Sequence, residues 1–260
     1  MDAIPTWIFF LAAGVIGLEL GSLATIFIQR WIDEVPILRP TGSRCPSCEH
    51  ALGLLDTIPL LSFILLKGRC RHCEAVIGAQ YLLVELSCMA WALASAYRFG
   101  LSPEWAVYLV LGVMLIAGSF IDFETFLLPD RVTLGGAGMA LAASFFLENG
   151  VGWRSATLGA VAGAGAFWIL QQAYRLVRKE EGLGTGDVKL MAMIGGMTGL
   201  PGLPLTILIG SLSGLVGSVY YTIRPGKDGI KGRVPYGPFL SLGCMVYLLY
   251  GKEIMKWWIS

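Results

Sequence analysis

Two aspartates stand at the edges of long apolar runs. Asp187 occurs in GLGTGDVKL, between a glycine-rich turn and one apolar run, and Asp122 occurs in GSFIDFETFLLPDRV, where another run ends. Two carboxyl groups that lie close together do not both ionise readily, so the pair titrates as a unit and keeps one proton near neutral pH. The ionised member takes a proton from water while the neutral member polarises a peptide carbonyl. This pattern predicts an aspartyl protease with Asp122 and Asp187 as its catalytic pair.

Glycines at 184 and 186 allow a sharp turn before Asp187 and the close approach of a substrate strand. The alternative is structural, because Asp130 and Asp187 both stand where a helix N-cap would occur. Acids inside apolar segments can also serve transport or helix packing. Glu19 and Glu85 are such acids, within the first two apolar segments. The residues alone leave these interpretations open.

Four of the six cysteines form two C-x-x-C pairs about twenty residues apart, a spacing typical of zinc sites. Each turn presents two thiolates, and two turns complete the tetrahedron that zinc prefers. The alternative, two disulfides, is disfavoured in a reducing cytoplasm. We therefore predict one zinc ion bound by Cys45, Cys48, Cys70 and Cys73.

The remaining cysteines and both histidines have simpler interpretations. Cys88 and Cys244 fall within apolar runs, where a free cysteine usually packs as a small apolar side chain. His50 and His72 stand beside the zinc cysteines, and we expect them to pack or hydrogen-bond there rather than to catalyse.

The composition indicates an integral membrane protein. Of the 260 residues, 55% are hydrophobic and only 14% are charged, whereas soluble domains have about 25% charged residues. The apolar runs are continuous rather than alternating, which favours helices over a β-barrel. We expect an all-α polytopic membrane protein embedded in a lipid bilayer. The net charge of +1 says little about partners, and no strongly basic region suggests nucleic acid. About 20 apolar residues cross a bilayer, which predicts about eight transmembrane helices, at 4–28, 80–97, 105–121, 132–147, 153–174, 188–203, 204–223 and 236–250.

These segments divide the chain into three parts. Residues 1–28 form the first transmembrane helix, which we expect to be retained because no basic segment precedes it. Residues 29–79 form a polar, zinc-binding insert whose apolar stretch LLDTIPLLSFILL is too short to cross a bilayer. Residues 80–260 form the helical bundle that carries the aspartates.

The distribution of basic residues predicts the orientation. Lys and Arg concentrate in cytoplasmic loops, and 15 of the 19 fall in the insert and in the loops 122–131, 175–189 and 224–233. These connections are therefore predicted to be cytoplasmic, and both termini to lie outside. Asp122 and Asp187 would then stand at cytoplasmic helix ends, where they can meet although they are far apart in the chain.

Six segments in order resemble the type IV prepilin peptidases, over nearly the whole chain. They are GLELGS at 17–22, the cysteine-bearing segment 43–73, YLLVEL at 81–86, IDFETFLLPD at 121–130, GTGDVKL at 184–190 and VPYGPFLSLG at 234–243. Two places depart from the family pattern. Glu124 stands where the family commonly has a second aspartate, so we expect it to be a supporting acid, and GSLATIFIQR in the first segment replaces the more usual GSFLNVVIYR.

The resemblance implies a bifunctional enzyme of the bacterial inner membrane, serving type IV pilus or type II secretion systems. It implies catalytic roles for Asp122 and Asp187, and prepilin or pseudopilin substrates that are cut at the cytoplasmic membrane face. It also implies N-methylation of the new N-terminus from S-adenosylmethionine. The sequence has no G-x-G-x-x-G fingerprint after a strand, so it does not identify the residues that bind the methyl donor. The insert is the candidate region for this site.

Two rival functions differ in their sequence signatures. A presenilin-like intramembrane aspartyl protease shares the G-x-G-D turn but lacks the C-x-x-C insert. A transporter or a zinc-sensing membrane scaffold would carry acids near mid-membrane, and Glu19 alone fits that pattern poorly.

Overall fold

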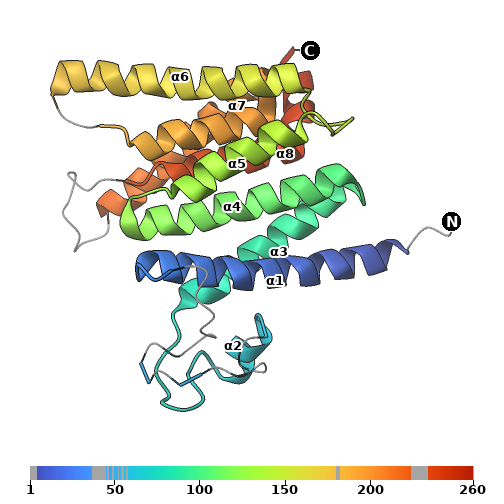
Figure 1. Ribbon diagram of the computed structural model, residues 1–260, viewed down its shortest axis with the longest axis vertical. Helices are drawn as coiled ribbons and strands as arrows, with labels where there is room; N and C mark the ends of the chain where they lie inside the picture. Colours follow the sequence, from blue (N-terminus) through green and yellow to red (C-terminus); the bar gives the residue numbers. More distant parts are fainter. Residues whose placement is uncertain are drawn as a thin grey trace. The chain divides into compact units, whose positions relative to one another are not determined.

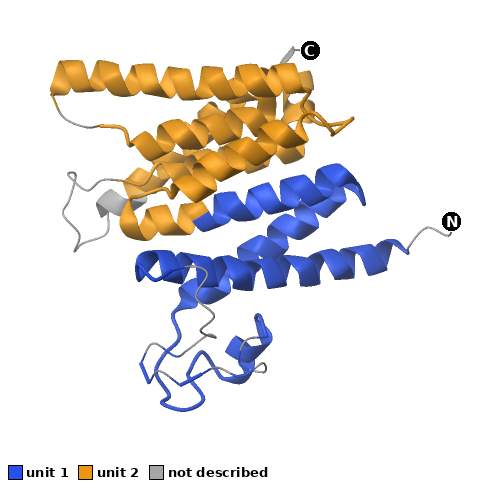
Figure 2. Cartoon of the chain, viewed as in Figure 1, with its two compact units in different colours: residues 1–117 blue, residues 118–260 orange. Residues whose placement is uncertain are grey.

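The chain is helical throughout its described part. The computed structural model describes residues 5–36, 45, 47–48, 50–51, 53, 56, 58–179, 182–223 and 234–259. No β-strand occurs in these residues, and their one isolated antiparallel bridge joins Arg69 to Val76. The chain divides into two compact units, residues 1–117 and residues 118–260 (Figure 2). The prediction of an all-helical protein is confirmed.

Eight helices make up the described structure (Figure 1). Unit 1 contains α1 (Thr6–Ile32), α2 (Leu61–Leu65), α3 (Ala79–Phe99) and most of α4 (Pro103–Thr125). Unit 2 contains the end of α4, then α5 (Asp130–Ala143), α6 (Trp153–Arg178), α7 (Thr185–Ile223) and α8 (Gly237–Ile259).

Four described helices are long and apolar enough to cross a membrane. They are α1, α3, α4 and the part of α7 from Thr185 to Val219. Helix α5 has 14 residues, fewer than the roughly 20 that a perpendicular crossing needs. The structure thus has the helices of a membrane protein, and α5 is shorter than the segment predicted at 132–147.

The predicted segments 188–203 and 204–223 belong to one element, α7, which is broken inside. The break lies at Gly199, whose φ of 68° and ψ of 175° are not helical. Glycine adopts positive φ without a steric penalty, and Pro201 and Pro204 follow at once, where each removes a backbone donor. The predicted boundary at residue 203 is therefore corrected to Gly199.

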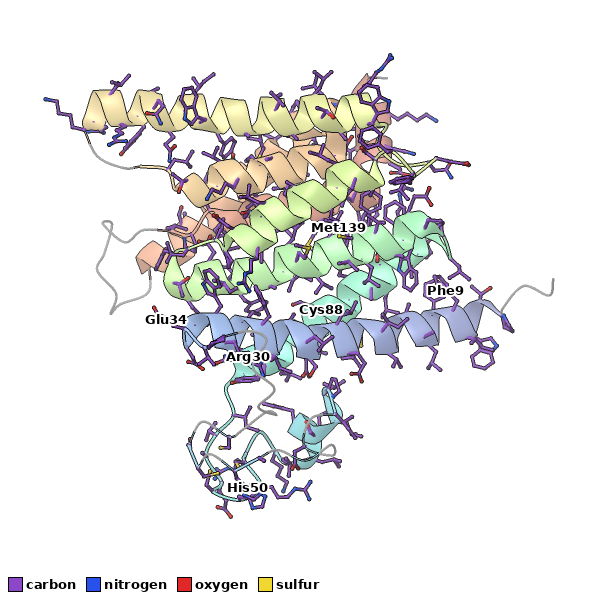
Figure 3. The ribbon with its side chains drawn as sticks, in the orientation of Figure 1. Phe9, Arg30, Glu34, His50, Cys88 and Met139 are labelled. Carbon is purple, nitrogen blue, oxygen red and sulfur yellow. The ribbon has the colours of Figure 1, made fainter. Side chains whose placement is uncertain are left out.

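Helices α1 and α3 approach each other closely through glycines one turn apart. A Cβ atom on Gly17 would lie 2.6 Å from the Cβ of Ala92, and one on Gly21 would lie 2.7 Å from the Cα of Glu85. Small residues at this spacing let two membrane helices bring their backbones together. Cys88 lies fully buried at this contact (Figure 3), as predicted for a cysteine that only packs.

Helix α7 is the central helix of unit 2. It contacts α5, α6 and α8, and the side chains of Met191, Met193 and Ile194 are 0% exposed. At Gly195 its backbone meets that of Gly159 in α6, with no room for a side chain on either residue. The helix that begins with the G-T-G-D turn is therefore held on three sides by other helices of the unit.

Candidate functional site

Asp122 lies in the last turn of α4, and the structure buries it. Its side chain is 5% exposed, and its Oδ2 accepts a hydrogen bond of 3.1 Å from the backbone N–H of Gly237. Gly237 is the first residue of α8, where backbone N–H groups have no partner inside the helix and carry partial positive charge. The start of α8 therefore supplies a specific donor that orients this carboxylate.

Asp187 lies in the first turn of α7 and is half-buried. The helix begins at Thr185, and the carboxylate turns back toward the preceding residue, Gly184, whose backbone N–H donates to it. A third-position carboxylate that satisfies the N-cap amide is one half of a capping box. Asp187 is thus the third residue of α7 and not its N-cap, so the N-cap interpretation is wrong for this residue.

The structure brings Asp122 and Asp187 together within unit 2. Their side chains lie close enough for their charges to interact, although the residues are far apart in sequence. Leu128, from the connection between α4 and α5, packs against the backbone beside both aspartates. Its side chain would lie 3.0 Å from a Cβ on Gly186 and 3.2 Å from a Cβ on Gly237. The two carboxylates therefore share an apolar wall and glycine-lined backbone.

Gly237 is a site residue that the sequence did not single out. A Cβ atom there would lie 2.7 Å from Oδ2 of Asp122, so any side chain would displace the carboxylate. The segment VPYGPFLSLG was noted only for its resemblance to the family. Nothing in its spacing indicates that its glycine N–H faces an aspartate 115 residues earlier.

Glu124 and Asp130, the other two acids of segment 121–130, have surroundings that differ from those of the pair. Glu124 is exposed, two residues beyond the buried Asp122, and positions two apart on a helix do not face each other. Asp130 is not an N-cap, because the cap position of α5 is Pro129 and no side chain caps the helix. Asp130 instead accepts a 2.6 Å hydrogen bond from Nζ of Lys189, which joins the first turns of α5 and α7.

In unit 1, four sulfur atoms gather as the C-x-x-C spacing predicts. The Sγ atoms of Cys45, Cys48, Cys70 and Cys73 all lie within 4.8 Å of one another, and none of these cysteines forms a disulfide. The Sγ atoms of Cys45 and Cys73 are 3.7 Å apart. Two sulfurs bound at about 2.3 Å to one ion, at the tetrahedral angle, are separated by about 3.8 Å. The cluster therefore fits a tetrahedral, thiolate-preferring metal ion.

The two cysteine turns have the same backbone form. The N–H of Cys45 donates to the carbonyl of His50 at 3.0 Å, and the N–H of Cys70 donates to the carbonyl of Ala75 at 2.9 Å. Both bonds connect the first cysteine of a pair to the fifth residue after it. The backbone N–H groups of Ser47 and Cys48 donate toward the Cys45 sulfur and lower the pKa of this thiol to about 6, whereas burial and the other three thiols raise the pKa of Cys73 to about 12. The four thiols therefore titrate as a group in which Cys45 ionises first.

The histidines and the buried cysteine of α8 behave as predicted. The rings of His50 and His72 pack on each other with their centroids 3.6 Å apart, and neither belongs to the sulfur cluster. Cys244 is 0% exposed in the core of unit 2. Oε2 of Glu85 accepts a hydrogen bond of 2.7 Å from the backbone N–H of Leu60.

Two protein-family models match the chain. Residues 15–99 match the bacterial peptidase A24 N-terminal domain, and residues 109–219 match the type IV leader peptidase family. Among similar proteins, the prepilin leader peptidase/N-methyltransferase of Aeromonas hydrophila is 34% identical, over 98% of this chain and 95% of its own length. The protein of the same name from Pseudomonas putida is also 34% identical, over 95% of this chain and 92% of its own length.

A third protein of this name, from Pseudomonas aeruginosa, is 36% identical, over 84% of this chain and 75% of its own length. No solved structure gives a significant match. Both family models match in chain order, and together they include the helices that carry Asp122 and Asp187 and both cysteine turns. The chain belongs to the type IV leader peptidase family.

Proposed function

We propose that this protein is a membrane-embedded aspartyl endopeptidase that removes the basic leader from type IV prepilins or pseudopilins and methylates the new N-terminus. The observation that supports the peptidase most directly is that the side chains of Asp122 and Asp187 lie close together in unit 2. Asp122 lies at the end of α4, and Asp187 lies at the start of α7. The names of the relatives support both activities.

In the proposed mechanism the carboxyl groups of Asp122 and Asp187 share one proton. The ionised member removes a proton from water, whose oxygen bonds to the scissile carbonyl carbon, while the protonated member donates to the carbonyl oxygen. As the tetrahedral intermediate collapses, one of its hydroxyl groups returns a proton to the pair and the C–N bond breaks. The leaving amine takes the other proton from the pair, which is left with one shared proton as at the start. The Gly237 N–H holds Asp122 in one orientation through this cycle.

We assign the cysteine cluster to one zinc ion, bound by Cys45, Cys48, Cys70 and Cys73. Zinc with four thiolates has no open position, so its contribution is to hold the insert folded rather than to activate water. Binding and folding of such a small site are coupled, because the unfolded segment has no preformed site.

The protein is further proposed to lie in the bacterial inner membrane with about eight membrane segments, counting the two parts of α7 separately. The bias of basic residues supports a cytoplasmic position for the insert and for the ends of α4 and α6. The loop 224–233, which has four of these residues, lies outside the described part of the chain. A reporter that is active only outside the cytoplasm should be active after Lys252 and silent at Lys227, and the opposite pattern would contradict the orientation.

One experiment separates the two proposed activities. A synthetic prepilin peptide is incubated with the purified protein, with and without S-adenosylmethionine, and the products are weighed by mass spectrometry. We expect loss of the leader in both reactions, and an added methyl group only when the methyl donor is present. An uncut peptide would contradict the peptidase, and a cut but unmethylated peptide would contradict the methyltransferase.

A further inference from the structure

Unit 1 contains a cavity of about 400 Å³ among α1, α3 and the cysteine-bearing insert. Gln29 and Arg30 line it from α1, Tyr81 and Glu85 line it from α3, and Phe63 lines it from the insert. Figure 3 shows Arg30 near the C-terminal end of α1. Pockets of about 300–1,000 Å³ are typical of small-molecule sites. The cavity lies entirely in the unit without the aspartate pair.

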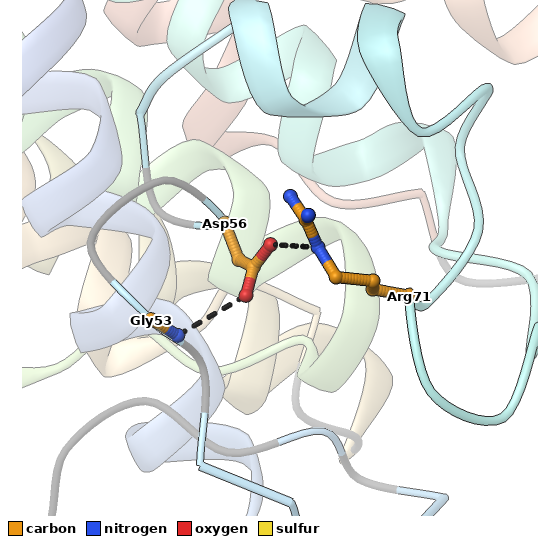
Figure 4. Close-up of polar contacts among 3 residues, drawn as sticks. All are labelled: Gly53, Asp56 and Arg71. Atoms are coloured by element: carbon orange, nitrogen blue, oxygen red, sulfur yellow. Dashed lines mark hydrogen bonds and ion pairs between the residues drawn. The ribbon is translucent and has the colours of Figure 1, made fainter.

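The charges that line this cavity have a definite pattern. Its acids are Asp33, Asp56 and Glu85. Asp56 is already paired, since its Oδ1 accepts a 2.8 Å hydrogen bond from Nε of Arg71 and its Oδ2 accepts the N–H of Gly53 at 3.1 Å (Figure 4). The Gly53 N–H, with Arg71, lowers the pKa of the Asp56 carboxyl. The carboxylates of Asp33 and Glu85 remain to face a ligand.

Glu85 is held in place at the cavity wall. Its Oε2 accepts the 2.7 Å hydrogen bond from the N–H of Leu60, a residue with φ of 62° and ψ of −49°. The N–H of Leu61 donates to the carbonyl of Pro59 at 2.6 Å, so Leu60 is the centre of a γ-turn of the rare positive-φ kind. Of the described residues, only Leu60 donates a hydrogen bond to Glu85. The turn therefore fixes one carboxylate oxygen and leaves the other for a ligand.

Part of the cavity wall is apolar. This part includes Phe63, Leu66, Ile77 and Leu82, together with the ring of Tyr81, and polar side chains such as Thr25 and Ser62 line the wall between them. Small-molecule sites combine such walls with a few placed polar groups that orient the ligand. The cavity therefore suits a ligand with one flat, apolar-faced ring system and more than one charge.

We propose that this cavity binds S-adenosylmethionine, the methyl donor of the activity proposed above, on which the inference rests. The ligand carries a sulfonium cation, an ammonium cation and a carboxylate. Asp33 and Glu85 match its two cations, and the apolar part of the wall accepts the adenine ring. The site is thus complementary to the ligand in both charge and polarity.

The charge of the ligand changes when the methyl group is transferred, so the site should distinguish the donor from its product. The free amine of the cut pilin uses its lone pair to form an N–C bond to the methyl carbon, after its ammonium form has lost a proton to water. The C–S bond breaks, and its electron pair stays on sulfur, which becomes a neutral thioether. The product therefore lacks the cation that the carboxylates favour, so the site should bind the donor more tightly than S-adenosylhomocysteine.

The test measures binding directly, with the full chain in detergent and its zinc retained. Titration calorimetry with S-adenosylmethionine compares the wild type with Glu85→Gln, which keeps an acceptor for the Leu60 N–H but removes the charge. We expect affinity to fall about tenfold to a hundredfold, as is typical when a charged partner is lost, with little change in Tm. Affinity for S-adenosylhomocysteine should fall less. Equal losses for both ligands would contradict the role assigned to the carboxylate.

Neighbouring residues supply a matched control. Asp33→Asn should weaken donor binding, whereas Glu34→Gln, at the next position but outside the cavity lining, should leave it within about twofold. Peptide cleavage should be unchanged in Glu34→Gln. If the wild type binds the donor and methylates, and the Asp33 and Glu85 variants bind the donor with the same affinity, the proposed site is wrong. The proposed function would still stand.

A second measurement does not depend on variant folding. Radiolabelled S-adenosylmethionine is photocrosslinked to the wild-type protein, and the labelled peptides are identified. We expect the label between residues 22 and 85, the limits of the cavity lining. Label confined to residues 118–260 would overturn the site, and a wild type that neither binds nor transfers the methyl group would contradict the methyltransferase proposal itself.

Discussion

At the scale of single residues, the two carboxylates have different surroundings. Asp122 is buried and receives an N–H from the start of α8, whereas Asp187 is half-buried and turns back to the N–H of Gly184. Each thus has a backbone donor that restricts its rotation. Orientation of the reacting groups before the substrate arrives is a main source of catalytic rate.

The first prediction concerns this pair. Asp122→Asn and Asp187→Asn remove the shared proton and should each lower cleavage about a thousandfold or more, with the double variant little worse, because residues that act as a unit are strongly non-additive. Glu124→Gln should do far less, since Glu124 is exposed and lies on another side of α4. Cleavage rates with Tm values test this. A folded Asp122→Asn protein that cuts at the wild-type rate would remove Asp122 from the pair.

The second prediction concerns Gly237. In Gly237→Ala the new methyl group would lie 2.7 Å from Oδ2 of Asp122, so the carboxylate must move. A displacement of this size should lower kcat about tenfold to a hundredfold. Gly138→Ala is the control, because a Cβ on Gly138 in α5 meets nothing within 4 Å. Equal rates for the two variants would show that the Gly237 contact has no effect on catalysis.

At the scale of elements, two kinds of contact position the helices. Ion pairs and hydrogen bonds join helix ends, as Asp130 and Lys189 join the starts of α5 and α7. Glycines bring helix backbones together along their lengths, as Gly17 and Gly21 do between α1 and α3. The first kind joins the ends of neighbouring helices, and the second holds helices together within a unit where lipid provides no hydrophobic drive.

The third prediction concerns the ion pair. Both side chains are partly exposed, at 34% for Lys189 and 61% for Asp130, so a double-mutant cycle with Asp130→Asn and Lys189→Met should give a coupling of about 1 kcal/mol or less in stability. Cleavage should fall only modestly, because neither residue belongs to the proposed catalytic pair. A loss of cleavage as large as that of Asp187→Asn would assign this pair a direct role instead.

The fourth prediction concerns the contact between α1 and α3. In Gly21→Ala the methyl group would lie 2.7 Å from a backbone atom of Glu85, which cannot move aside as a side chain would. Overpacking of this kind costs about 1–3 kcal/mol, so the Tm should fall. Gly14→Ala, whose nearest contact would be an ordinary 3.6 Å to Leu93, should leave the Tm unchanged or raise it. Thermal melting in detergent gives both values.

At the scale of the whole molecule, the two units contain different candidate sites. Unit 1 contains the cysteine cluster and the charged cavity, and unit 2 contains the aspartate pair. Each unit also matches its own family model over most of its length. The sites proposed above assign the peptidase to unit 2 and the methyl donor to unit 1, so we expect changes in one unit to cause selective loss of one activity.

The fifth prediction concerns the metal. Elemental analysis should find about one zinc per chain, as a four-thiolate site requires. Cys45→Ser and Cys70→Ser, which change the two buried members of the cluster, should lose the zinc and lower the Tm. Cys244→Ala should keep it, because Cys244 lies in the core of unit 2. A protein without metal, with disulfides between the four cysteines under reducing conditions, would contradict the assignment.

Local chemistry decided much of this structure. Cys45 and Cys70 begin turns whose short spacing forces two sulfurs to one side, so a tetrahedral cluster was predictable without a fold. The apolar runs of α1, α3, α4 and α7 were likewise predictable, because bilayer thickness sets their length. The end of α5 and the break at Gly199 were not, since both depend on which neighbours a helix meets.

The sequence by itself determined the candidate chemistry: two aspartates beside apolar runs, and four cysteines in two turns. Only the tertiary structure decided that Gly237 faces Asp122, that Asp130 pairs with Lys189 rather than capping its helix, and that Glu85 lines a cavity. The physical reason is that each of these contacts joins residues on different elements. Spacing along one helix or turn determines which side chains share a face, but the packing of helices determines which faces meet.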